Sequence, residues 1–333
     1  MDRLVYYYPE GHQEHAQFGH PERPERVEAI RRSLIDNKLW SPFRKIEGAD
    51  FVDEIFPLVH DSDYLGRVQE YSAAGKSLDP DTYLTEKSWE IAKMTARGTA
   101  AVAGEVWDQQ AGSGFALARP PGHHAESSRG MGFCLLNNSA ITAEYLVQRK
   151  NANQITIIDL DVHHGNGTQE IFYDRADVSY FSVHQFPFYP GTGTKSETGV
   201  GPGRGKVINI PLPAGSGDQA YSSVLESYLI PFLGEMNPEM VLVSIGFDLH
   251  WKDPIGGMLV SAEKIYQLIK ALKQWVEVNC QRGLVLILEG GYDLEASGLC
   301  AAACSAALVG QSFLDSLGSA PQKENPDWKI YLK

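Results

Sequence analysis

The chain has 333 residues, of which 43% are hydrophobic and 21% charged, and its formal net charge is −13 at pH 7. This length suits one large α/β enzyme domain, and the composition is that of an ordinary globular protein. The acidic balance disfavours nucleic acid as a partner, because phosphate contacts need a basic surface. The 4 cysteines are too few for a disulfide framework in a chain of this length.

Targeting and membrane signals are missing from the sequence. The opening stretch MDRLVYYYPE lacks the basic segment followed by an apolar segment that is typical of a signal peptide. No apolar run approaches the length that spans a bilayer. We therefore expect a cytoplasmic protein that binds neither membrane nor nucleic acid, and the sequence does not indicate an oligomeric state.

Short apolar, β-branched runs alternate with helical patterns along the chain. This alternation predicts an α/β fold with a largely parallel sheet covered by helices. No linker rich in Pro, Gly or Ser divides the sequence, so we expect one domain over residues 1–333. The expected strands are 3–8, 113–119, 154–161, 178–184, 206–212, 240–248 and 283–291, and the expected helices are 24–37, 86–107, 137–150, 261–279 and 296–310.

Polar clusters follow most of the expected strands. In an open α/β sheet, ligands bind in the crevice at the carboxyl ends of the strands, so we expect the active site at that edge. The clusters are RPPGHH (119–124), DVHHGNG (161–167), HQFPFYPGTG (184–193), PAGSGD (213–218), FDLHWKDP (247–254) and EGGYD (289–293).

The segment DLDVHHGNG, residues 159–167, combines two aspartates with two histidines. Residues two apart at the end of a strand point to the same side, so Asp161 and His163 can converge on one ion. A catalytic zinc needs three protein ligands, and Asp248 at the end of another expected strand is the third candidate. A solvated surface cluster is the alternative for each motif alone, and the two motifs together favour a metal.

Two tandem histidines, His123 and His124, follow a rigid Pro-Pro-Gly turn. Histidine is the usual general acid and base near neutral pH, and each ring needs a partner on its far nitrogen. Asp159 and Asn166 are spare polar groups that can serve as these partners. Tyr292 follows two glycines and can donate a hydrogen bond to a developing oxyanion. Exposed loop residues are the alternative interpretation of the histidine pair.

Taken together, these motifs resemble the histone deacetylase family, which includes the bacterial acetylpolyamine amidohydrolases. The similarity runs from HPERPERV, near residue 20, to LEGGY, near residue 290, and RPPGHHA, GFCLLNN, DLDVHHGNGTQ, FYPGTG, GFD and EGGY occur in the order of that family. HHGNGTQ and LEGGY, with Asn166 and Glu289, are similar to the class II and bacterial branch. The resemblance implies an arginase-like or deacetylase-like fold with a central, mostly parallel sheet of about eight strands flanked by helices.

The resemblance also implies roles for individual residues. His124 would be the general base and acid, and Tyr292 would polarise the amide carbonyl. His123, paired with Asp159, would be an electrostatic helper. One catalytic zinc would be bound by Asp161, His163 and Asp248.

For the substrate, the resemblance implies a narrow tunnel that holds a lysine-like methylene chain. Its walls would be Gly132, Phe133 and Tyr189, with Ile255 near the rim. Asp81, in DPDTYL, would be a polar gate residue that binds the substrate backbone.

Structural potassium ions are a further implication of the resemblance. One site would use Asp159, Ser182 and backbone carbonyls of Asp161, His163 and Val183. A second site would use carbonyls of Phe172, Arg175 and Val178 with a contact from Tyr221.

The expected activity is zinc-dependent hydrolysis of the acetyl or acyl amide of a lysine-like or polyamine amine, with release of acetate and the free amine. A binuclear manganese ureohydrolase on the same fold and a non-catalytic acyl-lysine binder are the alternatives. Ureohydrolases carry Asp-x-Asp where this chain has Asp248 followed by His250, which favours one metal. The complete set of ligands, histidines and tyrosine favours an enzyme. An acylated lysine, an acetylated polyamine and a small acylated metabolite all stay open as the substrate.

Overall fold

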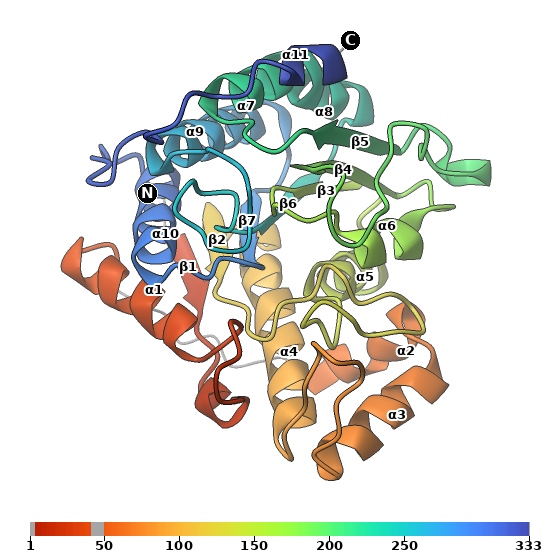
Figure 1. Cartoon of the computed structure of the whole chain (residues 1–333). Helices are drawn as coiled ribbons and strands as arrows, with labels where there is room; N and C mark the ends of the chain where they lie inside the picture. Colours follow the sequence, from red (N-terminus) through yellow and green to blue (C-terminus); the bar gives the residue numbers. More distant parts are fainter. Residues whose placement is uncertain (1–3, 41–49, 333) are drawn as a thin grey trace.

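The apolar runs of the sequence form the strands of one sheet, shown in the computed structural model of Figure 1, which describes residues 4–40 and 50–332. The strand order is β1-β2-β7-β6-β3-β4-β5, and every pair of neighbours is parallel. The strands are β1 (Leu4–Tyr7), β2 (Ser113–Ala116), β3 (Ile155–Asp159), β4 (Val178–Gln185), β5 (Val207–Leu212), β6 (Met240–Ile245) and β7 (Leu284–Leu288).

The described sheet has seven strands, slightly fewer than the count of about eight that the resemblance implied. Each apolar run that the sequence marks as a strand forms one strand. The remaining β-pairs in the described part of the chain are isolated bridges and not strands. The predicted parallel α/β architecture is confirmed, while a single domain over residues 1–333 stays a prediction.

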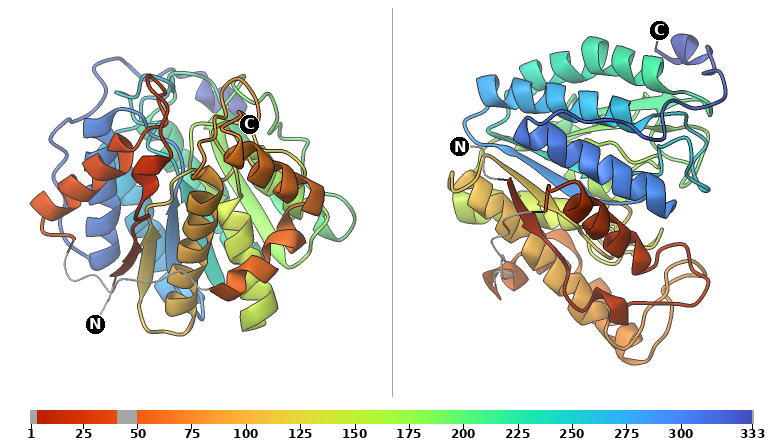
Figure 2. Two further views of the ribbon diagram at one scale, coloured as in Figure 1. Left: turned by 90° about the horizontal axis from the view of Figure 1, so that it is seen from below. Right: turned by 90° about the vertical axis from the view of Figure 1, so that its left-hand side faces the viewer.

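Helices cover both faces of the sheet, as the right-hand view of Figure 2 shows. One face carries α1 (Glu25–Asp36), α7 (Asp218–Val224), α8 (Ile230–Met236), α9 (Ala262–Asn279), α10 (Leu294–Val309) and the short α11 (Trp328–Tyr331). The other face carries α2 (Phe56–Val59), α3 (Ser62–Ala73), α4 (Ser88–Trp107), α5 (Asn138–Lys150) and α6 (Asn166–Phe172). A π-helical turn, Leu225–Leu229, joins α7 to α8, and short 3-10 turns lie at His12–Glu14, Asp50–Glu54 and Gly201–Gly203.

Two apolar cores result, one on each face of the sheet. Successive side chains of a strand point to opposite faces. In β7, Leu284 and Leu286 accordingly belong to the core under α9 and α10, whereas Val285 and Ile287 belong to the core under α4 and α5. Burial on both faces explains why the strands are apolar throughout instead of alternating.

Local signals determine where the main helices begin and end. Ser261 and Asp293 accept backbone N–H groups at the first turns of α9 and α10, and Asn137 does the same for α5. Gly310 ends α10 with a left-handed φ of 69°. None of the described helices is both long and apolar enough to cross a bilayer.

Because the sheet is parallel, the carboxyl ends of all strands lie at one edge. The loops that follow β2, β3, β4, β6 and β7 emerge there and contain the expected zinc ligands, both tandem histidines, Tyr292 and the expected walls of the tunnel. This edge therefore holds the candidate site.

Candidate active site

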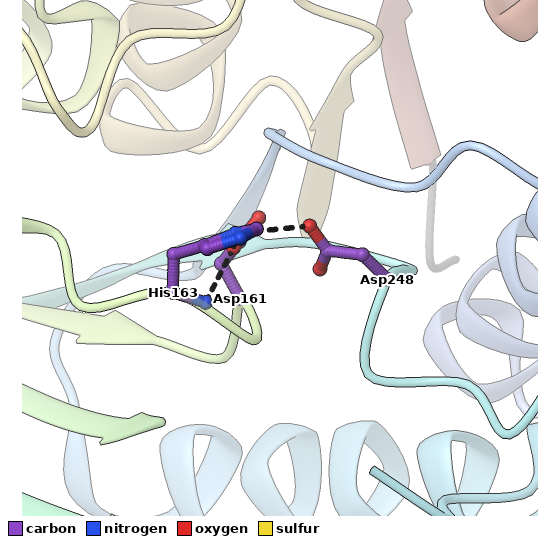
Figure 3. Close-up of side chains that lie close together, drawn as sticks. All are labelled: Asp161, His163 and Asp248. Atoms are coloured by element: carbon purple, nitrogen blue, oxygen red, sulfur yellow. Dashed lines mark hydrogen bonds and ion pairs between the residues drawn. The ribbon is translucent and has the colours of Figure 1, made fainter. Parts of the chain in front are cut away.

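Three acidic or imidazole side chains converge at the carboxyl edge of the sheet. Asp161 and His163 lie in the loop after β3 and Asp248 in the loop after β6, as Figure 3 shows. All three are buried, and each offers a ligand atom within 4.8 Å of the others. Within residues 4–40 and 50–332, this is the one group of three or more His, Cys, Asp or Glu with that geometry. His250 points elsewhere, since its Nδ1 accepts the backbone N–H of Lys252 at 3.1 Å.

The surroundings of the three residues fit a metal ion. Oδ2 of Asp248 is buried and makes no close hydrogen bond, although buried polar atoms are normally satisfied; its ion-pair contact with Nδ1 of His163 is 3.4 Å long. Two glycines keep the space around the carboxylates open. A Cβ on Gly290 would lie 2.0 Å from Oδ2 of Asp248, and one on Gly246 would lie 2.1 Å from Oδ2 of Asp161. Two carboxylates and one imidazole are a donor set that zinc accepts in catalytic sites.

The charges at the site also favour a cation. Burial, together with the charge of Asp161, raises the pKa of Asp248 to about 7. Burial alone would lower the pKa of His163, but its hydrogen bonds to the two aspartates raise that pKa to about 9. Two neighbouring buried carboxylates repel each other, and a bound cation would relieve this repulsion.

The tandem histidines lie beside this cluster, with ring centroids 4.1 Å apart. Nδ1 of His123 is 3.1 Å from Oδ2 of Asp159, and Nδ1 of His124 is 2.7 Å from Oδ1 of Asn166. The structure thus places His123 beside Asp159, the pair that the resemblance implied, and His124 beside Asn166, the other candidate partner. Tyr180 donates its hydroxyl hydrogen to the same Asp159 oxygen, at 3.0 Å.

The two histidines have opposite proton affinities. Burial opposes protonation of His123, but the charges of Asp159 and Asp161 outweigh it and raise the pKa of His123 to about 10. Burial, and then the charges of His123 and His163, lower the pKa of His124 well below its usual value. His124 is therefore neutral and can accept a proton, whereas His123 supplies a positive charge.

A fully buried carboxylate, Glu289, holds the loop of these histidines. It accepts the backbone N–H groups of Gly122 at 2.7 Å and of His123 at 3.1 Å, and the hydroxyl of Ser244 at 3.0 Å. Burial raises the pKa of Glu289 to about 7. The sequence analysis used Glu289 only as a marker of the family branch, and its contact with a loop some 165 residues away has no local sequence signal.

Tyr292 reaches the same site from the loop after β7. Its backbone N–H donates to Oδ2 of Asp253 at 2.6 Å, and the guanidinium of Arg26 lies 4.8 Å from the centroid of its ring. Burial raises the pKa of Tyr292 well above 10, so the phenol keeps its proton at neutral pH. A protonated phenol can donate a hydrogen bond to an oxyanion.

A cavity of about 390 Å³ connects these groups with the surface. It is lined by buried His123, His124 and His163 and by exposed Asp81 and Tyr189. Tyr189 is 43% exposed, and its ring centroid lies 5.2 Å from that of His124. The other lining residues are Asp79, Pro80, Pro121, Arg129, Met131, Gly132, Phe133, Phe188, Ile255, Gly290 and Tyr292.

All five residues expected in the tunnel line this cavity. Gly132 has a φ of 57°, and a Cβ there would lie 2.5 Å from the ring of His124, so the wall needs glycine at this position. The sequence analysis missed Phe188, whose ring stacks on His163 with centroids 5.1 Å apart. It also missed Asp79, which accepts the backbone N–H of Asp81 at 2.9 Å. Phe188 directly precedes Tyr189, and Asp79 lies two residues before Asp81.

The residues expected to bind potassium fall into two groups. Asp159 and Ser182 are register partners on β3 and β4, so their side chains lie together, and this potassium site stays a prediction. In the second set, the side chains of Phe172 and Val178 belong to the core under α4 and α5, whereas the side chain of Tyr221 belongs to the core on the opposite face of the sheet. This site would use backbone carbonyls, so it also stays a prediction.

A buried ion-pair network lies behind the catalytic loops. Arg119 donates to both carboxylate oxygens of Glu22, at 2.8 and 3.0 Å, and Arg26 donates to one of them at 3.1 Å. Arg26 also donates to the backbone carbonyls of Glu289 at 2.5 Å and Gly291 at 2.6 Å. These bonds fix the backbone on both sides of Gly290, directly before Tyr292.

Comparison with known proteins agrees with this geometry. A family model described as the histone deacetylase domain matches residues 20–308. The chain therefore belongs to the histone deacetylase family, and the resemblance inferred from its motifs is confirmed.

Relatives in several kingdoms support the same assignment. A probable deacetylase of Archaeoglobus fulgidus is 36% identical over 278 residues, which cover 83% of this chain and 77% of that protein. Histone deacetylase 14, chloroplastic, of Arabidopsis thaliana is 37% identical over 331 residues, covering 94% of this chain and 77% of the relative. The crystal structure of the HDA15 HD domain superposes with a TM-score of 0.87 at 33% identity, covering 95% and 92% of the two chains.

Proposed function

We propose that the protein is a zinc-dependent deacetylase that hydrolyses the acetyl or a similar acyl amide of a lysine-like or polyamine amine. The observation that carries the proposal is the convergence of Asp161, His163 and Asp248 within one cavity that also contains His124 and Tyr292. Family membership and the deacetylase names of the relatives support amide hydrolysis. Zinc, and the nature of the amine, are parts of our proposal.

A zinc ion held by the three ligand residues would supply a Lewis acid, which lowers the pKa of a bound water and polarises the amide carbonyl. The protein's own groups handle the protons. Nδ1 of His124 faces Asn166, so its Nε2 is the nitrogen that takes the proton of the attacking water. His124 then returns this proton to the amine nitrogen as the C–N bond breaks, and acetate and the free amine result.

Tyr292 and His123 stabilise charge during the same reaction. The phenol of Tyr292 donates a hydrogen bond to the carbonyl oxygen as negative charge develops on it. His123 lies next to His124, and its positive charge disfavours early protonation of His124. Phe133 and Phe188 exclude water from the sides of the cavity, and Gly132 lets its wall approach His124 closely.

The structure offers less support to the two alternatives. A binuclear ureohydrolase needs a second bridging carboxylate, and His250 at that position turns away from the three-residue cluster. A non-catalytic binder would not need a neutral histidine and a protonated tyrosine beside the metal ligands. One metal ion and catalysis are therefore the better interpretation.

The rim of the cavity bears on the class of substrate. Asp79 and Asp81 contribute two carboxyl groups there, against one guanidinium from Arg129. Ionised carboxylates accept hydrogen bonds from peptide amides and from ammonium groups. An acylated lysine in a peptide and an acetylated polyamine both fit this rim.

Cytoplasmic location also remains a prediction, since two plant relatives are named chloroplastic.

A substrate panel tests the proposed function directly. Acetyl-lysine peptides, longer acyl-lysine peptides and acetylated polyamines are compared by kcat/KM, with arginine and agmatine as ureohydrolase substrates. We expect hydrolysis of at least one acylated amine, with loss of activity in Tyr292→Phe. Hydrolysis of arginine or agmatine, or no turnover of any acylated amine by metal-loaded protein, would contradict the proposal.

A further inference from the structure

The orientation of one amide group decides which nitrogen of His124 carries a proton. Oδ1 of Asn166 is 2.7 Å from Nδ1 of His124, so Nδ1 must carry the hydrogen of this bond. An asparagine turned over by 180° would instead present its NH2 group, and Nδ1 would then have to be the acceptor. The free nitrogen, Nε2, would in that case carry the proton and could not act as a base.

The opposite end of the amide shows what determines its orientation. Nδ2 of Asn166 is 2.7 Å from Oε1 of Glu126 and 3.5 Å from Sδ of Met131. A carboxylate only accepts hydrogen bonds, and a thioether sulfur accepts weakly. In the turned orientation, Oδ1 would face the carboxylate oxygen with no hydrogen between them. Glu126 therefore favours the orientation in which Oδ1 faces His124.

Glu126 is itself held in place by the turn that contains it. Its backbone N–H donates to the carbonyl of Arg129 at 2.8 Å, and its carbonyl is 2.9 Å from Nδ1 of His60. The next residue, Ser127, bonds Glu170 of α6 through both its N–H and its hydroxyl. Asn166 is also the first residue of α6, so the turn and the amide are anchored to the same helix.

We propose that Glu126 is a positioning residue that orients the Asn166 amide and thereby keeps His124 in the tautomer with hydrogen on Nδ1 and a lone pair on Nε2. The inference rests on the proposed function, in which Nε2 of His124 accepts the proton of the attacking water. Glu126, Asn166 and His124 form a chain of two hydrogen bonds in which a neutral amide separates the carboxylate from the imidazole. This chain fixes the tautomer without placing a negative charge directly against His124.

The first test compares two substitutions of Glu126. Glu126→Leu removes the acceptor, and we expect kcat to fall about tenfold with little change in KM, as is typical for partners behind a functional histidine. Glu126→Gln retains an oxygen that accepts from Nδ2, and we expect most of the activity to return. Ser127→Ala, which removes a hydroxyl from the same turn, is the matched control and should keep kcat within about twofold.

The second test repeats the change in an Asn166→Asp background. A carboxylate at position 166 accepts from Nδ1 of His124 in either orientation, and Glu126 is then a like charge beside it. Glu126→Leu should therefore leave kcat unchanged or raise it in this background. The same tenfold loss in both backgrounds would show that Glu126 is merely structural and would overturn the proposal.

A spectroscopic readout separates this inference from the proposed function. Long-range ¹H–¹⁵N correlations of the histidine rings report the tautomer of His124 in the protein as purified, whether or not it turns over a substrate. We expect hydrogen on Nδ1 in the wild type and in Glu126→Gln, and a mixture of tautomers in Glu126→Leu. An unchanged Nδ1–H tautomer in Glu126→Leu would refute the inference, whereas an inactive wild type with the expected tautomers would refute only the proposed function.

Discussion

Two clusters of buried carboxylates in this molecule are neutralised in different ways. Glu22 accepts hydrogen bonds from Arg26 and Arg119 behind the catalytic loops. At the carboxyl edge of the sheet, Asp161 and Asp248 face each other, and in the described part of the chain their ion pairs are to histidines. All three carboxylates are inaccessible to solvent. The two clusters therefore differ in the partners of their carboxylates and not in their burial.

The pKa values reflect this contrast. Burial would raise the pKa of Glu22, but the two guanidinium groups outweigh it and hold that pKa at about 2. Burial and the charge of Asp161 raise the pKa of Asp248 to about 7. The first cluster is complete within the protein and stabilises the fold. In the second cluster the carboxylates are paired with imidazoles, and a metal ion in place of the His163 proton would balance their negative charge. Such perturbed pKa values are typical of a functional site.

Neutralising one carboxylate should have opposite effects on the free energy of unfolding in the two clusters. The largest effect on activity is expected for Asp248→Asn. Loss of a ligand should abolish metal binding and reduce turnover to the level of a blank. In the presence of a chelator, however, the same change removes a charge repulsion and should raise the free energy of unfolding by about 1–3 kcal/mol. Urea unfolding with and without chelator measures this, and a less stable variant under chelation would contradict the comparison.

The next largest effect is expected for the tandem histidines. His124→Ala removes the proposed general base and should lower kcat by about 10²–10⁴-fold, while the fold is retained. His123→Ala should be less impaired, because this ring acts through its charge. Steady-state kinetics of both variants at equal metal content are the measurement. Equal and mild losses in the two variants would be incompatible with the assigned roles.

Substitution of Glu22 tests the cluster in which arginines of the protein neutralise the carboxylate. Glu22→Gln leaves Arg26 and Arg119 buried without their charged partner and should lower the free energy of unfolding at pH 7 by about 3–5 kcal/mol. Glu22→Asp, which keeps the charge, is the matched control and should lose less. A near-neutral effect of Glu22→Gln would mean that the network contributes little to stability.

The pH dependence of the unfolding free energy tests whether the pKa of Glu22 is lowered by its arginine partners. The pKa of Glu22 lies at about 2, below the value of 4.5 for a free carboxyl, so its stabilising effect is complete above about pH 4.5. This effect is lost as the pH falls from about 4.5 toward 2. The difference in unfolding free energy between wild type and Glu22→Gln should therefore shrink over that range, and a constant difference would argue against the depressed pKa.

Tyr292→Phe should retain metal and substrate affinity but lower kcat by about 10²–10³-fold, the usual cost of one oxyanion donor. The substitution keeps the ring that lies over the guanidinium of Arg26, so the packing behind the site is retained. Kinetics and metal analysis of the variant are compared with those of the wild type. A near-normal kcat would remove Tyr292 from the mechanism.

The smallest of these effects is expected at the rim. Asp81→Asn weakens a charged acceptor, and a hydrogen bond to such a group is worth about 1.5–3 kcal/mol. We expect kcat/KM for the preferred substrate to fall by about 10- to 100-fold. A minimal acetyl-lysine analogue without backbone amides or extra ammonium groups should be affected far less. Equal losses for both substrates would show that Asp81 shapes the loop and does not contact the ligand.

Most of the fold and the centre of the site could be predicted from sequence because both depend on local patterns. Each buried parallel strand is an apolar run, and each polar cluster stands directly after such a run. Asp161 and His163 are two apart in sequence directly after β3, and Asp248 follows β6, which pairs with β3 in the sheet. The parallel topology then brings these strand ends together without further information.

The contacts that hold the site could not be predicted in this way. Arg26 bonds the carbonyl of Gly291 across 265 residues, and Glu289 bonds the N–H of His123 across 166 residues. Such contacts depend on how loops from distant strands meet, and no spacing in the sequence encodes them. The position of Tyr221 in the chain likewise does not show that α7 packs on the opposite face of the sheet from Phe172.

Metal content is the most direct test of the claim that Asp161, His163 and Asp248 bind a cation. Protein purified without added metal is analysed for transition metals by mass spectrometry, with Asp248→Asn as the control. We predict one zinc ion per chain in the wild type and none in the variant. Two manganese ions per chain with arginine- or agmatine-hydrolysing activity, or an active wild type that contains no metal, would contradict this account.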